Sequence, residues 1–159
     1  MDDAWAAISP GWKLVDPEQA SHDSILLEGD IETGLSALVA LRGPRNGRVE
    51  SEAFANQSKL FERALASLSS GSIFAAMSAN GMAVAAATGD DEALRICNSA
   101  IARGAISAGV TGTGPAIAII CYEQHADSLA EFVRESEMEV IAAAFTQSRM
   151  QSEEASRWE

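Results

Sequence analysis

Residues 109–120 read GVTGTGPAIAII, and this stretch decides how the rest of the chain is interpreted. Glycine lacks a Cβ atom, so its backbone reaches positive φ and can approach another group closely. Pro115 fixes φ and begins the apolar run without needing an amide hydrogen. We therefore predict a glycine loop between a helical pattern and a strand. Such a loop either binds a ligand through its backbone or forms a tight turn against a neighbour.

Two common phosphate-binding loops are excluded by the residues around these glycines. No Gly-Lys-Ser/Thr follows them, as it would in a Walker loop. The stretch also enters a strand, whereas a dinucleotide-binding loop opens a helix.

The composition limits the class of protein. The chain has 159 residues, 47% of them hydrophobic, which is enough for about one domain with a real core. Its formal net charge of -12 repels phosphate backbones and anionic lipid, so we expect neither nucleic acid nor a membrane as a partner. Cys97 and Cys121 lie in apolar contexts and are expected to be buried free thiols, which fits a reducing cytoplasm. His22 and His125 are far apart, so no metal site is predicted.

Hydrophobic periodicity and turn residues predict the elements. We expect a short helix over 2–8, strands over 12–15, 25–28 and 35–41, helical patterns over 54–68, 72–87 and from Asp90 to Gly104, a short strand near Ile106, a strand over 116–122, a helix over 126–135 and a last strand over 139–145. The polar stretch from Gly29 to Gly34 is the predicted internal boundary. The predicted fold class is α+β with a split-βαβ sheet and helices stacked on one face.

Three motifs, and their order along the chain, resemble the GHMP kinase family. The loop from Gly109 to Ala116 is similar to the family's third motif, Ser/Thr-Gly-x-Gly-Pro. Ala76, Met77, Asn80 and Gly81 resemble the archaeal-type shikimate kinase branch, and so does the opening Asp2-Asp3-Ala4 with Pro10-Gly11 after it. The resemblance implies a remnant of the kinase N-terminal domain over 1–33, a ferredoxin-like GHMP kinase C-terminal domain with inserted helices over 34–150, and a polar tail over 151–159.

The same resemblance implies an activity. Shikimate kinases of this type transfer phosphate from ATP, with Mg²⁺, to a hydroxyl of a small acid, and Asp2 corresponds to their base or cation organiser. The alternative is that Asp2 and Asp3 only form a solvated helix start. The family's Gly-x-Gly-x-x-Ser-Ser-Ser phosphate loop has no counterpart in this sequence. The chain therefore resembles the carboxyl-terminal half of a kinase, and its expected partner is the missing amino-terminal half. We expect no cofactor and no turnover for the chain alone.

Other residues carry alternative interpretations. Arg42, Arg45 and Arg48 could clamp a substrate carboxylate or form a solvated basic loop. Asn80 could face an active site or bond a neighbouring carbonyl. The threonine hydroxyls of the glycine loop could contact substrate or phosphate, or bond their own turn. The candidate loop residues are Gly109, Thr111, Gly112, Thr113, Gly114 and Pro115. A non-catalytic ligand-binding, regulatory or dimerisation module, and a fragment of a homoserine or mevalonate kinase, remain as alternatives.

Two further expectations concern the backbone and assembly. Gly112 and Gly114 are expected to include positive φ, so alanine there would cost stability. If half of a kinase is missing, the strands over 12–15 and 25–28 lack sheet neighbours, and unpaired edges recruit other chains. We therefore expect a homodimer with residues 1–30 in its interface.

Overall fold

A computed structural model describes residues 10–16, 18–19, 24–44 and 50–145. Its contacts divide the chain into two units, residues 34–144 and a smaller unit of residues 1–33 with 145–159. Each unit is described by itself. In the smaller unit, β1 (Trp12–Val15) and β2 (Ile25–Gly29) form an antiparallel pair, with Trp12 opposite Gly29. Both of these strands were predicted, and β2 extends one residue beyond its predicted end.

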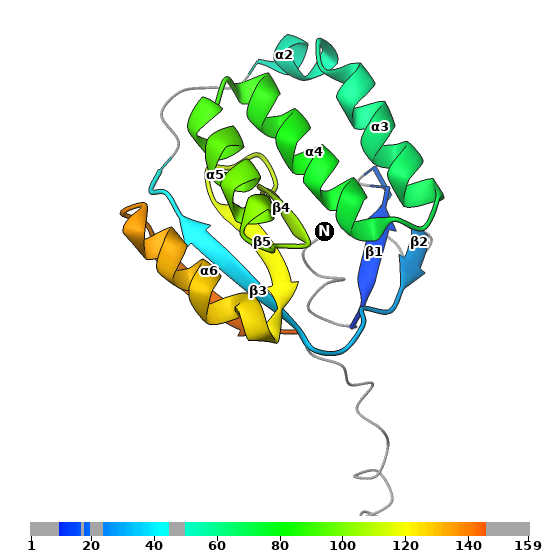
Figure 1. Ribbon diagram of the computed structural model, residues 1–159. Helices are drawn as coiled ribbons and strands as arrows, with labels where there is room; N and C mark the ends of the chain where they lie inside the picture. Colours follow the sequence, from blue (N-terminus) through cyan, green and yellow to red (C-terminus); the bar gives the residue numbers. More distant parts are fainter. Residues whose placement is uncertain (1–9, 17, 20–23, 45–49, 146–159) are drawn as a thin grey trace, which may run out of the picture. The chain divides into compact units, whose positions relative to one another are not determined.

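The larger unit is built on one four-stranded sheet (Figure 1). Its strands are β3 (Leu35–Leu41), β4 (Ser107–Val110), β5 (Ile117–Tyr122) and β6 (Glu139–Ala144), in the order β4-β5-β3-β6. Every neighbouring pair is antiparallel. A strand therefore lies between the two ends of each βαβ crossover, which confirms the predicted split-βαβ arrangement.

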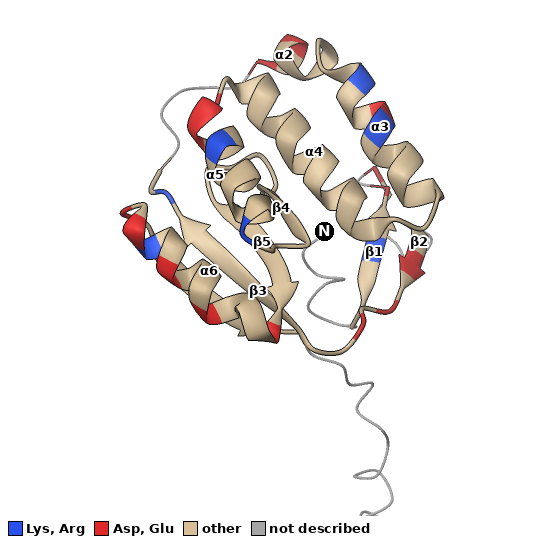
Figure 2. Ribbon diagram, in the orientation of Figure 1, with Lys and Arg blue, Asp and Glu red and all other residues tan. Residues whose placement is uncertain are grey.

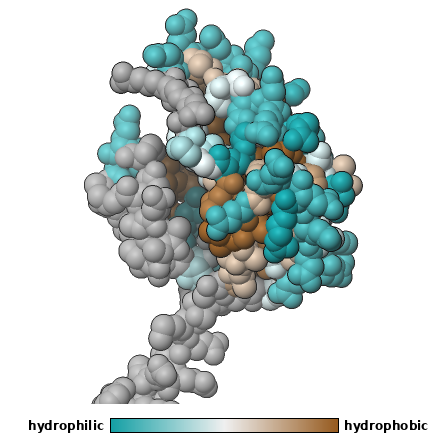
Figure 3. Space-filling model, turned by 90° about the vertical axis from the view of Figure 1, so that its left-hand side faces the viewer, coloured by the Kyte–Doolittle hydropathy of each residue, from teal (hydrophilic) through white to brown (hydrophobic). Residues whose placement is uncertain are grey.

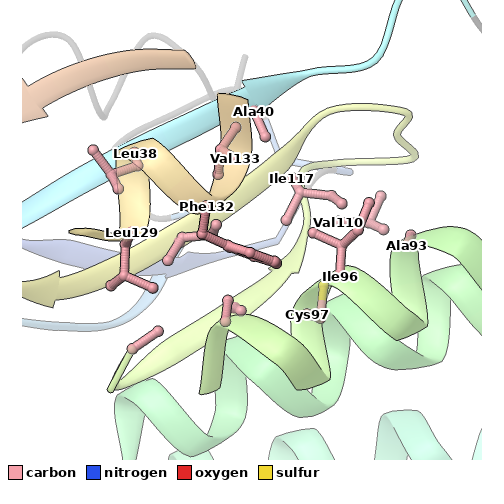
Figure 4. Close-up of a cluster of buried hydrophobic side chains, with 14 of the residues drawn as sticks. Leu38, Ala40, Ala93, Ile96, Cys97, Val110, Ile117, Leu129, Phe132 and Val133 are labelled. Carbon is pink, nitrogen blue, oxygen red and sulfur yellow. The ribbon is translucent and has the colours of Figure 1, made fainter. Parts of the chain in front are cut away.

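Five helices complete the described part of this unit. They are α2 (Ser51–Ala55), α3 (Ser58–Ser69), α4 (Ile73–Thr88), α5 (Asp91–Ala102) and α6 (Glu123–Glu135). Figure 4 shows Ile96 and Cys97 of α5, and Leu129, Phe132 and Val133 of α6, beside Leu38 of β3 and Ile117 of β5. These buried side chains form the core between the sheet and the two helices. The high alanine content of the core follows from the low aromatic content of the sequence.

Helix α4 takes a different position from α5 and α6, because it runs along the outer edge of β4. The Thr111 N–H donates to the Ala116 carbonyl across the β4–β5 pair, and successive N–H groups of a strand point to opposite sides. The Ala108 N–H is three residues before that of Thr111, so it points away from β5. Ser78 on α4 accepts that hydrogen bond through Oγ at 3.2 Å. The prediction that all helices stack on one sheet face is therefore wrong for α4.

Three other predicted boundaries were also wrong. The single helix predicted over 54–68 is two helices, because the chain turns at Asn56 and Gln57, where the Gln57 N–H bonds the Phe54 carbonyl. Helix α6 begins at Glu123, directly after β5, rather than at Ala126. The first N–H of a helix has no partner within the helix, and that of Glu123 donates to the Gly34 carbonyl instead. Gly109 and Val110 belong to β4, which shortens the loop to residues 111–116.

Candidate functional site: the glycine loop and the cluster around Arg42

The glycine loop connects β4 to β5 through a tight turn. The Gly114 N–H donates to the Thr111 carbonyl at 2.7 Å, and the Thr111 N–H donates to the Ala116 carbonyl at 2.9 Å. Gly112 has φ +51 and Thr113 is not in the positive-φ region, which is the pattern of a type II′ turn with glycine at its first central position. Gly114 has φ +86, so the predicted positive φ is confirmed at both glycines.

The tip of this loop carries backbone donors that the loop itself does not use. Gly112 and Thr113 are exposed, and within the described part of the chain their N–H groups have no hydrogen-bond partner. The hydroxyls of Thr111 and Thr113 likewise make no hydrogen bond with a described residue. Two free N–H groups and two hydroxyls at one turn can donate to an anion, and donation to a charged acceptor is the stronger kind of hydrogen bond.

Arg42 joins the base of this loop to the start of α5. Its Nη1 lies 3.3 Å from the Pro115 carbonyl, and its two terminal nitrogens bind both carboxylate oxygens of Asp90, at 2.5 and 2.8 Å. Nη2 also binds Glu92 at 2.6 Å. The Arg42 side chain is 10% exposed and that of Asp90 is 21% exposed, whereas that of Glu92 is 62% exposed, so the Arg42–Asp90 pair is largely buried and Glu92 lies at its solvent side. Arg42 therefore fixes the position of the loop's last residues relative to α5.

The carboxylates of this cluster suit the helix end on which they lie. Asp90 is the N-cap of α5 and accepts the Ala93 N–H at 2.9 Å, and Figure 2 shows acidic residues at this start of α5. Negative charge is stabilised at a helix N-terminus by its free N–H groups and dipole. The hydrogen bond to Asp90 raises the pKa of Arg42 above its ordinary value, against the opposing effect of burial. Arg42 thus keeps its charge at any pH at which the protein folds.

Gly109 has a packing function rather than a place in the loop. Its Cα faces Gly81 on α4, and a Cβ atom added to Gly109 would lie 2.9 Å from the Gly81 Cα and 3.2 Å from the Met77 carbonyl oxygen. Strand β4 and helix α4 therefore approach so closely that neither glycine has room for a side chain. For Gly109, the tight-packing interpretation is correct.

The other predicted site residues are Asn80, Asp2 and the three arginines. Asn80 is exposed on α4, and its side chain makes no hydrogen bond with a described residue. Asp2, Arg45 and Arg48 lie outside the described residues. Arg42 contacts the loop as described above, but its guanidinium already binds two carboxylates of its own chain, so a role in clamping substrate stays a prediction.

Sequence reasoning missed Asp90 and Glu92. Asp90 was identified only as a helix start, since nothing in the sequence links it to an arginine 48 residues earlier. Among the residues that the structure describes, no three His, Cys, Asp or Glu side chains come together in a way that could hold a metal ion. The described helices include none long and apolar enough to cross a membrane. Cys97 and Cys121 are buried free thiols, as predicted.

Several solved structures are similar in fold to this chain at low sequence identity. A phosphotransferase related to the CoA biosynthesis pathway is similar over 77% of this chain and 42% of its own length, with 14% identity and a TM-score of 0.58. A homoserine kinase from Cytophaga hutchinsonii matches 86% of this chain and 48% of its own, with 16% identity and a TM-score of 0.45. A mevalonate diphosphate decarboxylase from Staphylococcus aureus matches 81% and 50%, with 8% identity and a TM-score of 0.47.

The chain thus spans less than half the length of the first of these structures. No curated protein sequence matches it significantly. Residues 37–138 match the family profile described as GHMP kinases C terminal, which covers more than half of the chain and includes the whole glycine loop. The chain therefore belongs to the GHMP kinase C-terminal family.

Proposed function

We propose that this chain is the C-terminal part of a small-molecule phosphotransferase and that its glycine loop contacts the phosphate being transferred. The observation that carries the proposal is the pair of unused N–H groups of Gly112 and Thr113 at the exposed turn tip. Phosphoryl transfer depends mainly on positioning and on neutralising charge at the phosphate oxygens, and backbone N–H groups supply both without reorganising.

The rigidity of the loop supports this assignment. Its base is held by the Arg42 contact to Pro115, by the Thr111–Ala116 hydrogen bond, and by the glycine-to-glycine packing of β4 against α4. Donors that are fixed before the reaction stabilise developing charge more than donors that must first be ordered. The tip can therefore serve as a fixed anion contact, while the rest of the site comes from outside this unit.

For the reaction itself we propose ATP-dependent phosphorylation of a shikimate hydroxyl, with Mg²⁺, in the cytoplasm. The support is the sequence resemblance at Ala76, Met77, Asn80 and Gly81 and at the opening Asp2-Asp3-Ala4. In this proposal Asp2 acts as base or cation organiser, and a phosphate-binding half precedes this chain. Homoserine and mevalonate are the acceptors to test beside shikimate.

The test is an ADP-release assay on the chain joined to the coding region that precedes it. We expect ADP formation that depends on shikimate, and none from the 159-residue chain alone, because its sequence has no counterpart of the Gly-x-Gly-x-x-Ser-Ser-Ser loop that would hold the nucleotide. Homoserine and mevalonate are assayed in parallel. Turnover of homoserine or mevalonate instead of shikimate would replace shikimate as the proposed acceptor. Turnover by the chain alone would contradict the proposal that the chain holds only part of the active site.

A single-residue variant tests the loop within the same assay. Thr113→Val removes a hydroxyl at the exposed tip and keeps the side-chain shape, so we expect kcat/KM to fall by about tenfold, the effect of one hydrogen bond to a charged group. Ser128→Ala on α6 is the matched control, because that hydroxyl bonds only the His125 carbonyl of its own helix. Equal activity of both variants would remove the Thr113 hydroxyl from the proposed site.

A further inference from the structure

The two outer edges of the four-stranded sheet are protected to different degrees. At the β4 edge, α4 packs closely along the strand and Ser78 satisfies the outward Ala108 N–H. At the opposite edge, β6 pairs only with β3 among the described strands, and β1 and β2 form a separate sheet with each other. The outward N–H and C=O groups of β6 therefore lack a strand partner within the described residues.

Apart from Glu139 at its start, the sequence of β6 contains none of the features that usually protect an edge. It reads EVIAAA, with no lysine, no proline and no bulge in its register with β3. Five of its six residues are exposed, and Ile141 is 49% exposed. Figure 3 shows a group of apolar side chains among hydrophilic ones on one face of the molecule. Natural sheets avoid a long, apolar, uncharged edge unless it is paired with another strand.

We propose that β6 is an interaction surface that pairs in antiparallel fashion with β6 of a second copy of this chain. A strand is the partner that matches a row of unpaired N–H and C=O groups at the spacing of a sheet. The two four-stranded sheets would join into one of eight strands around a two-fold axis perpendicular to the sheet. This interface is distinct from residues 1–30 and does not depend on the proposed enzymatic activity.

The sequence of β6 is compatible with itself in this arrangement. A two-fold axis perpendicular to the sheet keeps side chains on their own face, so one residue of β6 must lie opposite its own copy. With Ile141 at that position, two exposed isoleucines pack against each other, beside Val39, which is opposite Ile141 in the β3–β6 pair. Glu139 then lies opposite Ala143 of the second copy, and the two Glu139 side chains are about 13 Å apart along the strands.

This self-compatibility favours a second copy over an unrelated strand. Glu139 is the only charged residue of β6, and in the symmetric register it does not lie opposite the Glu139 of the second copy. The rest of the strand has no charge that an unrelated partner could recognise. A six-residue strand pair buries little area, so we expect association in the micromolar range rather than a permanent dimer.

The test is analytical ultracentrifugation of the 159-residue chain over a range of concentrations, with three lysine variants. Ile141→Lys places two like charges opposite each other at the two-fold axis and should weaken dimerisation by about tenfold or more. Leu65→Lys on α3 is the matched control, because Leu65 is similarly exposed, and it should leave the dimer unchanged. Leu26→Lys on β2 examines the alternative interface, since Leu26 is 55% exposed, and it should also leave the dimer unchanged.

Amide hydrogen exchange provides an independent measurement on the unmodified chain. We expect alternate amides of β6 to be protected at high concentration and to lose protection on dilution, while the core amides of β5 remain protected. A chain that stays monomeric at high micromolar concentration would overturn the proposal. So would a dimer that Ile141→Lys leaves intact, or one that only Leu26→Lys disrupts.

Discussion

Replacing Gly81 with alanine tests the contact on which the position of the glycine loop depends. In the middle of a free helix this change is favourable, because alanine is preferred over glycine by about 1 kcal/mol. In α4 the added Cβ would lie 2.7 Å from the Val110 nitrogen and 2.8 Å from the Gly109 carbonyl carbon, and it would also press on the Gly109 Cα. These are backbone atoms of β4, so no side chain can rotate away to make room.

The two effects have opposite signs, and their sizes decide the outcome. Overpacking a well-packed site costs about 1–3 kcal/mol, and rigid backbone neighbours place Gly81 at the upper end of that range. After the helix preference is subtracted, we expect a net loss of about 2 kcal/mol in the free energy of unfolding. For a chain of this size, that loss corresponds to a fall in Tm of about 4–8 °C.

Urea unfolding followed by far-UV circular dichroism is the suitable assay. All five described helices belong to the 34–144 unit, whereas the three tryptophans, at positions 5, 12 and 158, belong to the other unit, so far-UV circular dichroism follows these helices more directly than tryptophan fluorescence does. Asn80→Ala is the control, because it is exposed on the same helix and should stabilise by a few tenths of a kcal/mol. Stabilisation by Gly81→Ala comparable to that of Asn80→Ala would refute the close approach of α4 to β4.

Three other predictions concern the loop, its anchor and a buried thiol. Arg42→Ala should lower the free energy of unfolding, measured in urea, by about 1–3 kcal/mol, because Asp90 and Glu92 lose a counter-charge. The control is Arg95→Ala on the exposed face of α5, which should change the free energy of unfolding by less than about 0.5 kcal/mol. Gly112→Ala and Gly114→Ala should each cost about 1 kcal/mol through positive φ, and a neutral result in urea unfolding would count against the turn geometry. Burial raises the pKa of Cys97 from 9.0 to about 11. The unfolded chain therefore loses this proton first, and stability that is intact below pH 9 should decline toward pH 11 in chemical denaturation, less steeply in Cys97→Ala.

Local patterns were sufficient for most of the elements but not for the contacts between them. The run over 35–41 was predicted correctly as a strand because a continuous apolar segment between two glycines fits a buried strand and is too short for a helix. The end of β4 was placed wrongly, since glycine and threonine are as typical of turns as of a strand packed against a helix. Gly109 is in the strand because Gly81, 28 positions earlier, leaves space for it, and the sequence does not show that these two residues meet.

In the candidate site, too, local conformation could be predicted from the sequence but contacts between distant residues could not. Glycine content and order predicted positive φ in the loop, because few residues other than glycine take that conformation. The three arginines after β3 were considered together as a basic loop. Arg42 differs from a solvated arginine because α5 places Asp90 and Glu92 against it, and this follows from the tertiary fold alone.

The most direct test of the central claim is an amide chemical-shift titration with Mg·ATP. It uses the chain joined to its preceding coding region, with the Gly112 and Thr113 signals followed individually. We predict that these two amides move downfield with saturation, as N–H groups do on donating to phosphate, while the Gly109 amide inside β4 stays in place. Shifts confined to other regions, with Gly112 and Thr113 unchanged at saturation, would contradict a role of the glycine loop in holding phosphate.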